Sequence, residues 1–351
     1  MRPAPLFPRG QALAARLHRV VSTAASASPS PRASPPRPLS VFFADWARVD
    51  LPDGHRFPMD KYARTREALR RDAALVNKIT LLESPKVDVE SELLLTHCPE
   101  YVQRVLTLTL REDEVRKIGF PMAQQNVERS LASTGGTVAC MREVMSGTAR
   151  ASAQIAGGTH HAYRDRGEGF CVFNDVAVAI NVARREFADA LRDRKILVID
   201  LDVHQGNGTA KIFEGDAQVV TFSMHGERNY PIKTREKSTH DVELPDDCED
   251  EEYLTLLDQW LPKLFDDYDP AIVFFQAGID ALKEDSFGRL AMSREGLLRR
   301  NNAVYSMCIA REVPLVITMG GGYSKPIEPS LDAHIDVFRS AALRFTAPQF
   351  I

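Results

Sequence analysis

The chain has 351 residues, of which 44% are hydrophobic and 26% are charged, an ordinary composition for a globular protein. No apolar run approaches the ~18 residues that a membrane-spanning helix needs, and the five scattered cysteines form no C-x-x-C pair, which argues against a disulfide framework or a cysteine zinc site. Residues 1–44 hold six of the 44 basic residues and no acidic one, so 38 basic and 48 acidic residues remain, a charge of −10 that disfavours direct nucleic-acid binding.

The N-terminal segment, residues 1–40, is rich in Arg, Ala, Ser and Pro. Its second half is of low complexity, which predicts disorder. An Arg-rich, Ser-rich and acid-poor N-terminus is typical of a mitochondrial or chloroplast transit peptide, and an ordinary disordered extension is the alternative, with the protein then in the cytoplasm or nucleus. We therefore expect residues 1–40 to be a disordered targeting extension and residues 41–351 to be one folded domain.

The first part of this domain is predicted to be mostly helical. A loop at residues 55–62 leads into the expected helices, which cover residues 62–82, 91–95, 99–107 and 126–145. Gly135 and Gly136 lie in the last of them, where two adjacent glycines indicate close packing against a neighbouring element.

From residue 150 onward, short apolar runs alternate with helical patterns. The predicted strands cover residues 152–156, 196–199, 218–223, 271–277 and 314–319, and the predicted helices cover residues 176–188, 208–213, 250–266, 293–311 and 330–343. Asn174 and Asp175 are positioned to cap the first of these helices, and residues 224–243 are expected to be a long polar loop. The alternation predicts βαβ units and a mainly parallel sheet within a single three-layer α/β/α domain.

The most informative stretch is residues 195–204, where a buried strand runs into Asp200, Asp202 and His204. Because side chains alternate along a strand, we expect these three side chains to share one face. Buried unpaired carboxylates are costly, and a cation is the usual remedy. Two carboxylates and an imidazole suit a divalent metal.

Three other predicted strands lead into glycine and then into a chemically capable side chain. They lead to the pair His160-His161, to Asp280 and to Tyr323. Each motif alone has a structural explanation, namely a surface histidine pair, a salt-bridged strand end or a tight turn. Their joint position at the carboxyl ends of strands, where ligands of α/β sheets bind, favours metal-assisted hydrolysis of an amide.

In this interpretation Asp202, His204 and Asp280 supply the three protein ligands of a catalytic metal and leave a position for water. His160 and His161 can then carry protons. Tyr323 can donate a hydrogen bond to a developing oxyanion.

The motifs occur in the order of a known family. Gly157-Gly-Thr-His-His-Ala, Gly169-Phe-Cys-Val-Phe-Asn-Asp175, Asp200-Leu-Asp-Val-His204, Gln276-Ala-Gly-Ile-Asp280 and Gly320-Gly-Gly-Tyr323 resemble those of the zinc-dependent histone deacetylase superfamily. The resemblance covers about residues 41–345. Asn207 and the segment 290–296 are most similar to the class IV branch and its bacterial relatives.

The resemblance implies a role for each matching residue. Asp202, His204 and Asp280 match the zinc ligands, His161 the general base, His160 its electrostatic or acid partner and Tyr323 the carbonyl-polarising tyrosine. In the surrounding shell, Asp200 matches the partner of the first histidine and, with Ser223, a structural potassium site, while Asn207 stands behind His161 and Gly169 and Phe170 match the substrate tunnel.

Two departures from class I members follow from the same comparison. Asn207 replaces an aspartate, so His161 should be less easily protonated. No counterpart of the aspartate at the class I rim is found near Gly119, which leaves the grip on the substrate backbone in doubt.

The function implied is a zinc-dependent hydrolase that removes acetyl or longer acyl groups from protein lysine side chains. A hydrolase of small acetylated amines, such as acetylpolyamines, is the alternative. A binuclear manganese ureohydrolase is disfavoured because Ala281 and Leu282 follow Asp280, and a non-catalytic scaffold because no motif residue is lost. Ferrous iron fits the ligands as well as zinc does. The natural substrate, the acyl-chain length and the oligomeric state stay open.

Overall fold

The computed structural model describes residues 37–47 and 49–347. Residues 1–36 of the predicted disordered targeting extension, residues 1–40, therefore lie outside the described residues. The first strand begins at Leu39, two residues before the expected start of the folded domain. Within the described part of the chain, no helix combines the length and apolarity that a membrane crossing requires.

The described residues form one eight-stranded sheet in which all neighbouring strands are parallel, in the order β2-β1-β3-β8-β7-β4-β5-β6. The strands are β1 (Leu39–Phe43), β2 (Ile79–Glu83), β3 (Ala151–Ile155), β4 (Lys195–Asp200), β5 (Val219–Gly226), β6 (His240–Leu244), β7 (Pro270–Gln276) and β8 (Leu315–Thr318). This topology confirms the predicted α/β fold with a parallel sheet.

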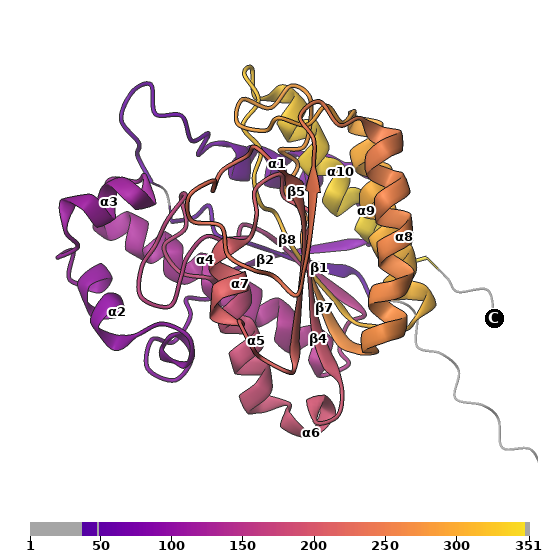
Figure 1. The fold of residues 1–351 in the computed structure, drawn as a ribbon, viewed down its shortest axis with the longest axis horizontal. Coiled ribbons are helices and arrows are strands. Elements are labelled where there is room, and N and C mark those ends of the chain that lie inside the picture. Colours follow the sequence, from indigo (N-terminus) through magenta and orange to yellow (C-terminus); the bar gives the residue numbers. More distant parts are fainter. Residues whose placement is uncertain (1–36, 48, 348–351) are drawn as a thin grey trace, which may run out of the picture. The chain divides into compact units, whose positions relative to one another are not determined.

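Helices cover both faces of the sheet (Figure 1). They are α1 (Lys61–Arg71), α2 (Pro99–Leu106), α3 (Glu112–Ile118), α4 (Gln124–Met145), α5 (Asp175–Glu186), α6 (Ala188–Leu191), α7 (Asn207–Ile212), α8 (Asp250–Tyr268), α9 (Arg294–Ala310) and α10 (Glu328–Phe345), with 3₁₀ turns η1 (Ala73–Leu75) and η2 (Leu93–Leu95). Helices α8, α9 and α10 lie on one face and α4 and α5 on the other. The three-layer arrangement is therefore confirmed.

Strand β4 shows why the central strands are apolar throughout. Leu197 and Ile199 belong to one hydrophobic cluster, and Ile196 and Val198 to the cluster on the opposite face. A strand buried on both faces has no solvent side, so its sequence does not alternate with polar residues.

Two local predictions are confirmed in detail. Gly136 packs α4 against β3 so closely that a Cβ atom there would lie 1.5 Å from Gln154 Oε1. At the start of α5, Asn174 Oδ1 accepts a hydrogen bond from the Ala177 amide at 2.9 Å, which satisfies one of the free donors of the first turn.

The predicted helix over residues 62–82 is wrong in its second half. Helix α1 ends at Arg71 because Asp72 is extended, and its carboxylate accepts a hydrogen bond from the Ala74 amide at 2.9 Å. The apolar residues that follow form β2 at the edge of the sheet. A short apolar run fits a strand and a helix equally well, so periodicity could not distinguish them.

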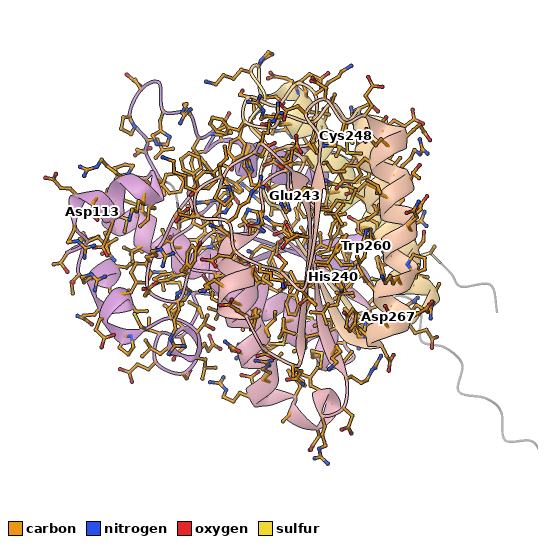
Figure 2. The ribbon with its side chains drawn as sticks, viewed as in Figure 1. Asp113, His240, Glu243, Cys248, Trp260 and Asp267 are labelled. Carbon is orange, nitrogen blue, oxygen red and sulfur yellow. The ribbon has the colours of Figure 1, made fainter. Side chains whose placement is uncertain are left out.

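The predicted polar loop over residues 224–243 is also partly wrong, because β5 continues to Gly226 and β6 begins at His240. Figure 2 shows His240 of β6 beside Trp260 of α8, and their ring centroids are 5.0 Å apart. As an edge strand, β6 is only half covered. Its residues alternate partly buried and exposed up to the buried Leu244, so its polar sequence resembled that of a loop.

Candidate active site

The chemically capable side chains follow four strands that are adjacent in the sheet, in the order β3-β8-β7-β4. The structure brings them to one edge, where they are His160 and His161 after β3, Tyr323 after β8, Asp280 after β7, and Asp202 and His204 after β4. One expected detail is wrong. Strand β4 ends at Asp200, so Asp202 and His204 reach the site from the following loop and not by strand alternation.

Asp202, His204 and Asp280 form a cluster whose ligand atoms all lie within 4.8 Å of one another. The Nδ1 atom of His204 is 2.9 Å from Asp202 Oδ1 and 3.0 Å from Asp280 Oδ2. Burial lowers the pKa of His204, but its hydrogen bonds to the two carboxylates outweigh burial and raise this pKa to about 10.

The cluster is therefore arranged to hold a positive charge between its carboxylates. Burial, followed by the charge of Asp202, raises the pKa of Asp280 to about 7. A divalent cation there would displace a proton from the cluster. An imidazole and two carboxylates suit zinc or ferrous iron, so the residues present fit a catalytic metal.

Backbone contacts fix the orientation of the two carboxylates. Asp202 Oδ2 accepts a hydrogen bond from the Gly321 amide at 2.8 Å, and Asp280 Oδ1 accepts one from the Val203 amide at 2.9 Å. A Cβ atom on Gly278 would lie 2.1 Å from Asp202 Oδ2, and one on Gly321 would lie 1.9 Å from Asp280 Oδ2. Only glycine permits the backbone to approach the carboxylates this closely.

Arg300 of α9 lies beneath this cluster and is fully buried. Its Nη1 atom donates to the carbonyl oxygens of Leu201 at 3.0 Å and Gly278 at 2.7 Å. These carbonyls belong to the two loops that carry Asp202 and Asp280. One buried guanidinium therefore joins the loops that present two of the three clustered side chains.

The adjacent histidines His160 and His161 have opposite electrostatic environments. His160 Nδ1 is 2.6 Å from Asp200 Oδ2. Burial lowers the pKa of His160, but the charges of Asp200 and Asp202 outweigh it and raise the pKa to about 9. Burial and the charges of His160 and His204 instead hold the pKa of His161 well below 6.5, so His161 is neutral at physiological pH.

The hydrogen bonds of Asn207 determine which nitrogen of His161 carries the proton. Asn207 Nδ2 donates to the carbonyl oxygen of Thr234 at 3.1 Å and to the hydroxyl of Tyr163 at 2.9 Å. Because a carbonyl can only accept, the amide of Asn207 must present Oδ1 to His161 Nδ1, at 2.7 Å. His161 Nδ1 therefore donates, and Nε2 keeps its lone pair.

Tyr323 is held from both its backbone and its ring. Its amide donates to Asp285 Oδ2 at 2.6 Å, and its ring centroid is 4.8 Å from that of Phe287 and 5.9 Å from that of Phe57. Burial and the nearby charges of Asp280 and Asp202 hold the pKa of Tyr323 well above 10. The phenol therefore keeps its proton and can donate it in a hydrogen bond.

Lys61 supports the glycine loop that leads to Tyr323. The ammonium group is fully buried and donates to the carbonyl oxygens of Gly320 at 3.3 Å and Gly322 at 3.4 Å. Its Nζ atom lies 4.8 Å from the ring centroid of Tyr323, within the range of a cation–π interaction.

A pocket of about 560 Å³ leads from the surface to these groups. Its lining residues are Gly54, His55, Arg56, Arg116, Lys117, Ile118, Gly119, His161, Gly169, Phe170, His204, Tyr230, Phe287 and Tyr323. The predicted tunnel residues Gly169 and Phe170 are therefore part of its wall. In the predicted rim region, Gly119 contributes backbone and no carboxylate.

The wall at Gly169 and Phe170 is fixed by the end of α3. Their amides donate to the carbonyl oxygens of Lys117 at 3.0 Å and Ile118 at 2.7 Å. A Cβ atom on Gly169 would lie 2.6 Å from His161 Cδ2, so this position requires a residue without a side chain.

Sequence reasoning missed four residues of this site, namely Lys61, Arg300, Phe287 and Tyr230. Tyr230 lines the pocket, its ring centroid is 5.0 Å from that of His161, and its hydroxyl donates to Glu168. No motif marks these positions. The aromatic residue before Pro231 in an otherwise polar stretch was the only available signal for Tyr230.

Comparisons with known proteins relate this chain to histone deacetylases. Residues 55–337 match the histone deacetylase domain. An uncharacterised protein of Picosynechococcus is 37% identical over 86% of this chain and 97% of its own length. Histone deacetylase 2 of Arabidopsis thaliana is 32% identical over 77% of this chain and 70% of its own length. A crystal structure of a deacetylase homolog from Aquifex aeolicus matches with a TM-score of 0.72 at 23% identity over 88% of this chain and 84% of that chain, which shows the shared fold.

Proposed function

Since this chain belongs to the histone deacetylase family, we propose that it is a zinc-dependent hydrolase that removes acetyl or longer acyl groups from lysine side chains of proteins. The observation that carries the proposal is the pairing of a neutral His161 with the Asp202–His204–Asp280 cluster in one pocket. An aromatic wall that includes Phe170 suits the aliphatic stem of an acylated lysine.

In the proposed reaction, the metal held by Asp202, His204 and Asp280 would supply Lewis acidity toward the amide carbonyl and the attacking water. His161 Nε2 accepts a proton from the water as its oxygen adds to the carbonyl carbon, and later returns that proton to the leaving amine. The Tyr323 phenol donates a hydrogen bond to the carbonyl oxygen as negative charge develops. His160, charged beside Asp200, stabilises the same charge.

The proposal is tested with the purified full chain on one lysine peptide that carries an acetyl, octanoyl or myristoyl group, with and without a chelator. We expect turnover that the chelator abolishes, and the preferred acyl chain measures the depth of the tunnel. Asp202→Asn, which keeps the shape but removes a ligand charge, should lose both metal and turnover. Full activity in metal-free protein would refute the mechanism.

The second candidate keeps the same chemistry but acts on a small acetylated amine. One relative in the family is acetoin utilization protein AcuC of Staphylococcus xylosus, which is 27% identical to this chain. The absence of a carboxylate at Gly119, within the described rim, favours a weak grip on a peptide backbone. Turnover of an acetylpolyamine by metal-containing protein that hydrolyses no acyl peptide would select this candidate.

A structural potassium ion is a further part of the proposal. Asp200 and Ser223 are neighbours in the register of β4 and β5. Asp200 is buried, so a monovalent cation between them would add to the compensation that His160 gives its charge. Replacing potassium chloride by sodium chloride at constant ionic strength should lower the melting temperature. An unchanged melting temperature would contradict this site.

We also propose that the protein is directed to an organelle and that it belongs to the class IV branch of the family. Residues 1–40 fused to a fluorescent protein should direct it to a mitochondrion or chloroplast, because their composition is typical of a transit peptide. Diffuse cytosolic fluorescence would contradict targeting.

A further inference from the structure

The mouth of the active-site pocket is cationic. Arg56, Arg116 and Lys117 are exposed side chains of its lining, and no Asp or Glu occurs among the described residues that line it. The contrast is local, because the chain as a whole carries a formal charge of −4. We refer to Arg56, Arg116 and Lys117 as the basic mouth.

Arg56 belongs to the loop that precedes α1. This loop runs beside α3 (Figure 1) and holds Arg56 in place. His55 Nδ1 accepts a hydrogen bond from the Phe57 amide at 3.1 Å, so its Nε2 donates to the carbonyl oxygen of Gly119 at 2.9 Å. The Arg56 guanidinium lies 4.8 Å from the ring centroid of Phe287. The charge of Arg56 is therefore attached to the aromatic wall that also contacts Tyr323.

Arg116 and Lys117 are held by the last turn of α3. The carbonyl oxygen of Lys117 accepts the hydrogen bond from Gly169, so the backbone that carries the charge also fixes the tunnel wall at Phe170. Cations at a helix C-terminus also interact favourably with the helix dipole. Arg116 and Lys117 could therefore have a structural role as well as a role in substrate selection.

The acidic residues near the mouth do not neutralise it. Arg116 Nη1 is 3.5 Å from Glu112, and both side chains are exposed, an arrangement that contributes little. Among the described residues, neither Arg56 nor Lys117 forms an ion pair within 4 Å. The exposed Asp53 and the partly exposed Asp113 do not line the pocket. The partly buried Asp285 accepts hydrogen bonds from the amides of Phe287, Gly288 and Tyr323.

We infer that the basic mouth selects acyl-lysines with acidic neighbours, so that the preferred substrates are anionic peptide segments and polycationic ones are disfavoured. The inference rests on the proposed deacylase function and names the substrate class of the same pocket. An acyl-lysine in the tunnel places its flanking residues at the rim, where two carboxylates can approach the three cations. A lysine-rich tail or a polyamine would place positive charges there.

The test compares acetyl-lysine peptides of equal length whose neighbouring residues are Glu, Gln or Lys. At low salt we expect kcat/KM to be about tenfold higher for the Glu-flanked than for the Lys-flanked peptide, since two exposed charge contacts give an effect of this order. The ratio should fall toward one as the ionic strength rises. Equal kcat/KM values for all three peptides at low salt would overturn the inference.

The Arg56→Gln/Lys117→Gln variant should lose most of this preference through KM, while kcat on the Gln-flanked peptide stays within about twofold. A purely structural role of Arg56 and Lys117 would instead change all three peptides equally, which would also overturn the inference. Lys263→Gln is the matched control, because Lys263 is an exposed lysine of α8 that does not line the pocket, and it should keep the preference.

Failure of the proposed function is distinguishable from failure of this inference. If the metal-containing full chain hydrolyses no peptide, the deacylase proposal fails. The role of the basic mouth is then tested by measuring the affinity of the same peptides, carrying a fluorescent label, by fluorescence anisotropy. Tighter binding of the Glu-flanked peptide, weakened in Arg56→Gln/Lys117→Gln, supports selection by the mouth. Equal affinities for the Glu-flanked and Lys-flanked peptides overturn it.

Discussion

Replacing Arg300 by methionine should weaken metal binding and destabilise the fold, although Arg300 belongs to neither the metal cluster nor the histidine pair. The guanidinium donates to the carbonyl oxygens of Leu201 and Gly278. A hydrogen bond to a charged group contributes ~1.5–3 kcal/mol, so the loss of two should lower the free energy of unfolding by about 3–6 kcal/mol. That is a large part of the ~5–15 kcal/mol by which a domain is stable.

The effect on the metal follows from the same two contacts, because they fix the loops that present Asp202 and Asp280. Removing a partner that orients metal ligands typically weakens binding by about 10–100-fold, and we expect Arg300→Met to fall in this range. Arg300→Lys keeps the charge and should recover part of the loss. Arg299→Met is the matched control, because Arg299 is an exposed neighbour that pairs with Glu251 at 2.6 Å.

The assay is a zinc titration of metal-free protein in competition with a chromogenic chelator, at a temperature where each variant is folded by circular dichroism. Urea unfolding of the metal-free proteins measures the change in the free energy of unfolding separately. If folded Arg300→Met bound zinc as tightly as the wild type, the hydrogen bonds of Arg300 to the two loops would have no role in metal binding.

Three other predictions concern single side chains. Tyr323→Phe should lower kcat by ~10² or more with unchanged metal content, the usual scale for a lost oxyanion donor, and an unchanged kcat would remove the phenol from the reaction. Burial lowers the pKa of His97 from 6.5 to about 4, so its contribution to stability is complete above pH 6.5 and about 3 kcal/mol is lost as the pH falls to 4. In urea unfolding at pH 7 and pH 4.5, His97→Gln should therefore lose less stability on acidification than the wild type; equal losses would contradict the assignment. Gly136→Ala should lower the free energy of unfolding by about 1–3 kcal/mol or more, because the new methyl group meets Gln154 Oε1, whereas a change below 0.5 kcal/mol would show that α4 can move away from β3.

The parts of the fold that were predictable are those with a local signature. Apolar runs that lead into glycine marked β3, β7 and β8, and an apolar run that leads into Asp200 marked β4. The polar residues after these runs mark the edge where the site lies. Strand β1 was also not predicted, because residues 41–43 indicated only the start of the folded domain. Strands β2 and β6 were missed because edge strands are partly exposed, so their side chains follow no fully buried pattern. The edge strands contribute none of the site residues.

The parts of the site that were not predictable depend on contacts with distant backbone. Lys61 donates to a carbonyl oxygen 259 residues later in the chain, and Arg300 to one 99 residues earlier. Because every residue type has a carbonyl group, such partners leave no trace in the sequence. The metal cluster differs because its ligands must be particular residue types, which form recognisable motifs.

The order of the functional residues along the chain has an evolutionary consequence. All three cations of the basic mouth lie before residue 120, whereas the histidine pair, the metal cluster and Tyr323 all lie after residue 159. A single genetic crossover in the turn between α4 and β3 would therefore exchange the mouth while leaving every reacting group in place. Paralogues could diverge in substrate preference by this route without passing through an inactive ancestor, provided that β1 still pairs with β3 and that the exchanged segment keeps Lys61, which supports the loop of Tyr323.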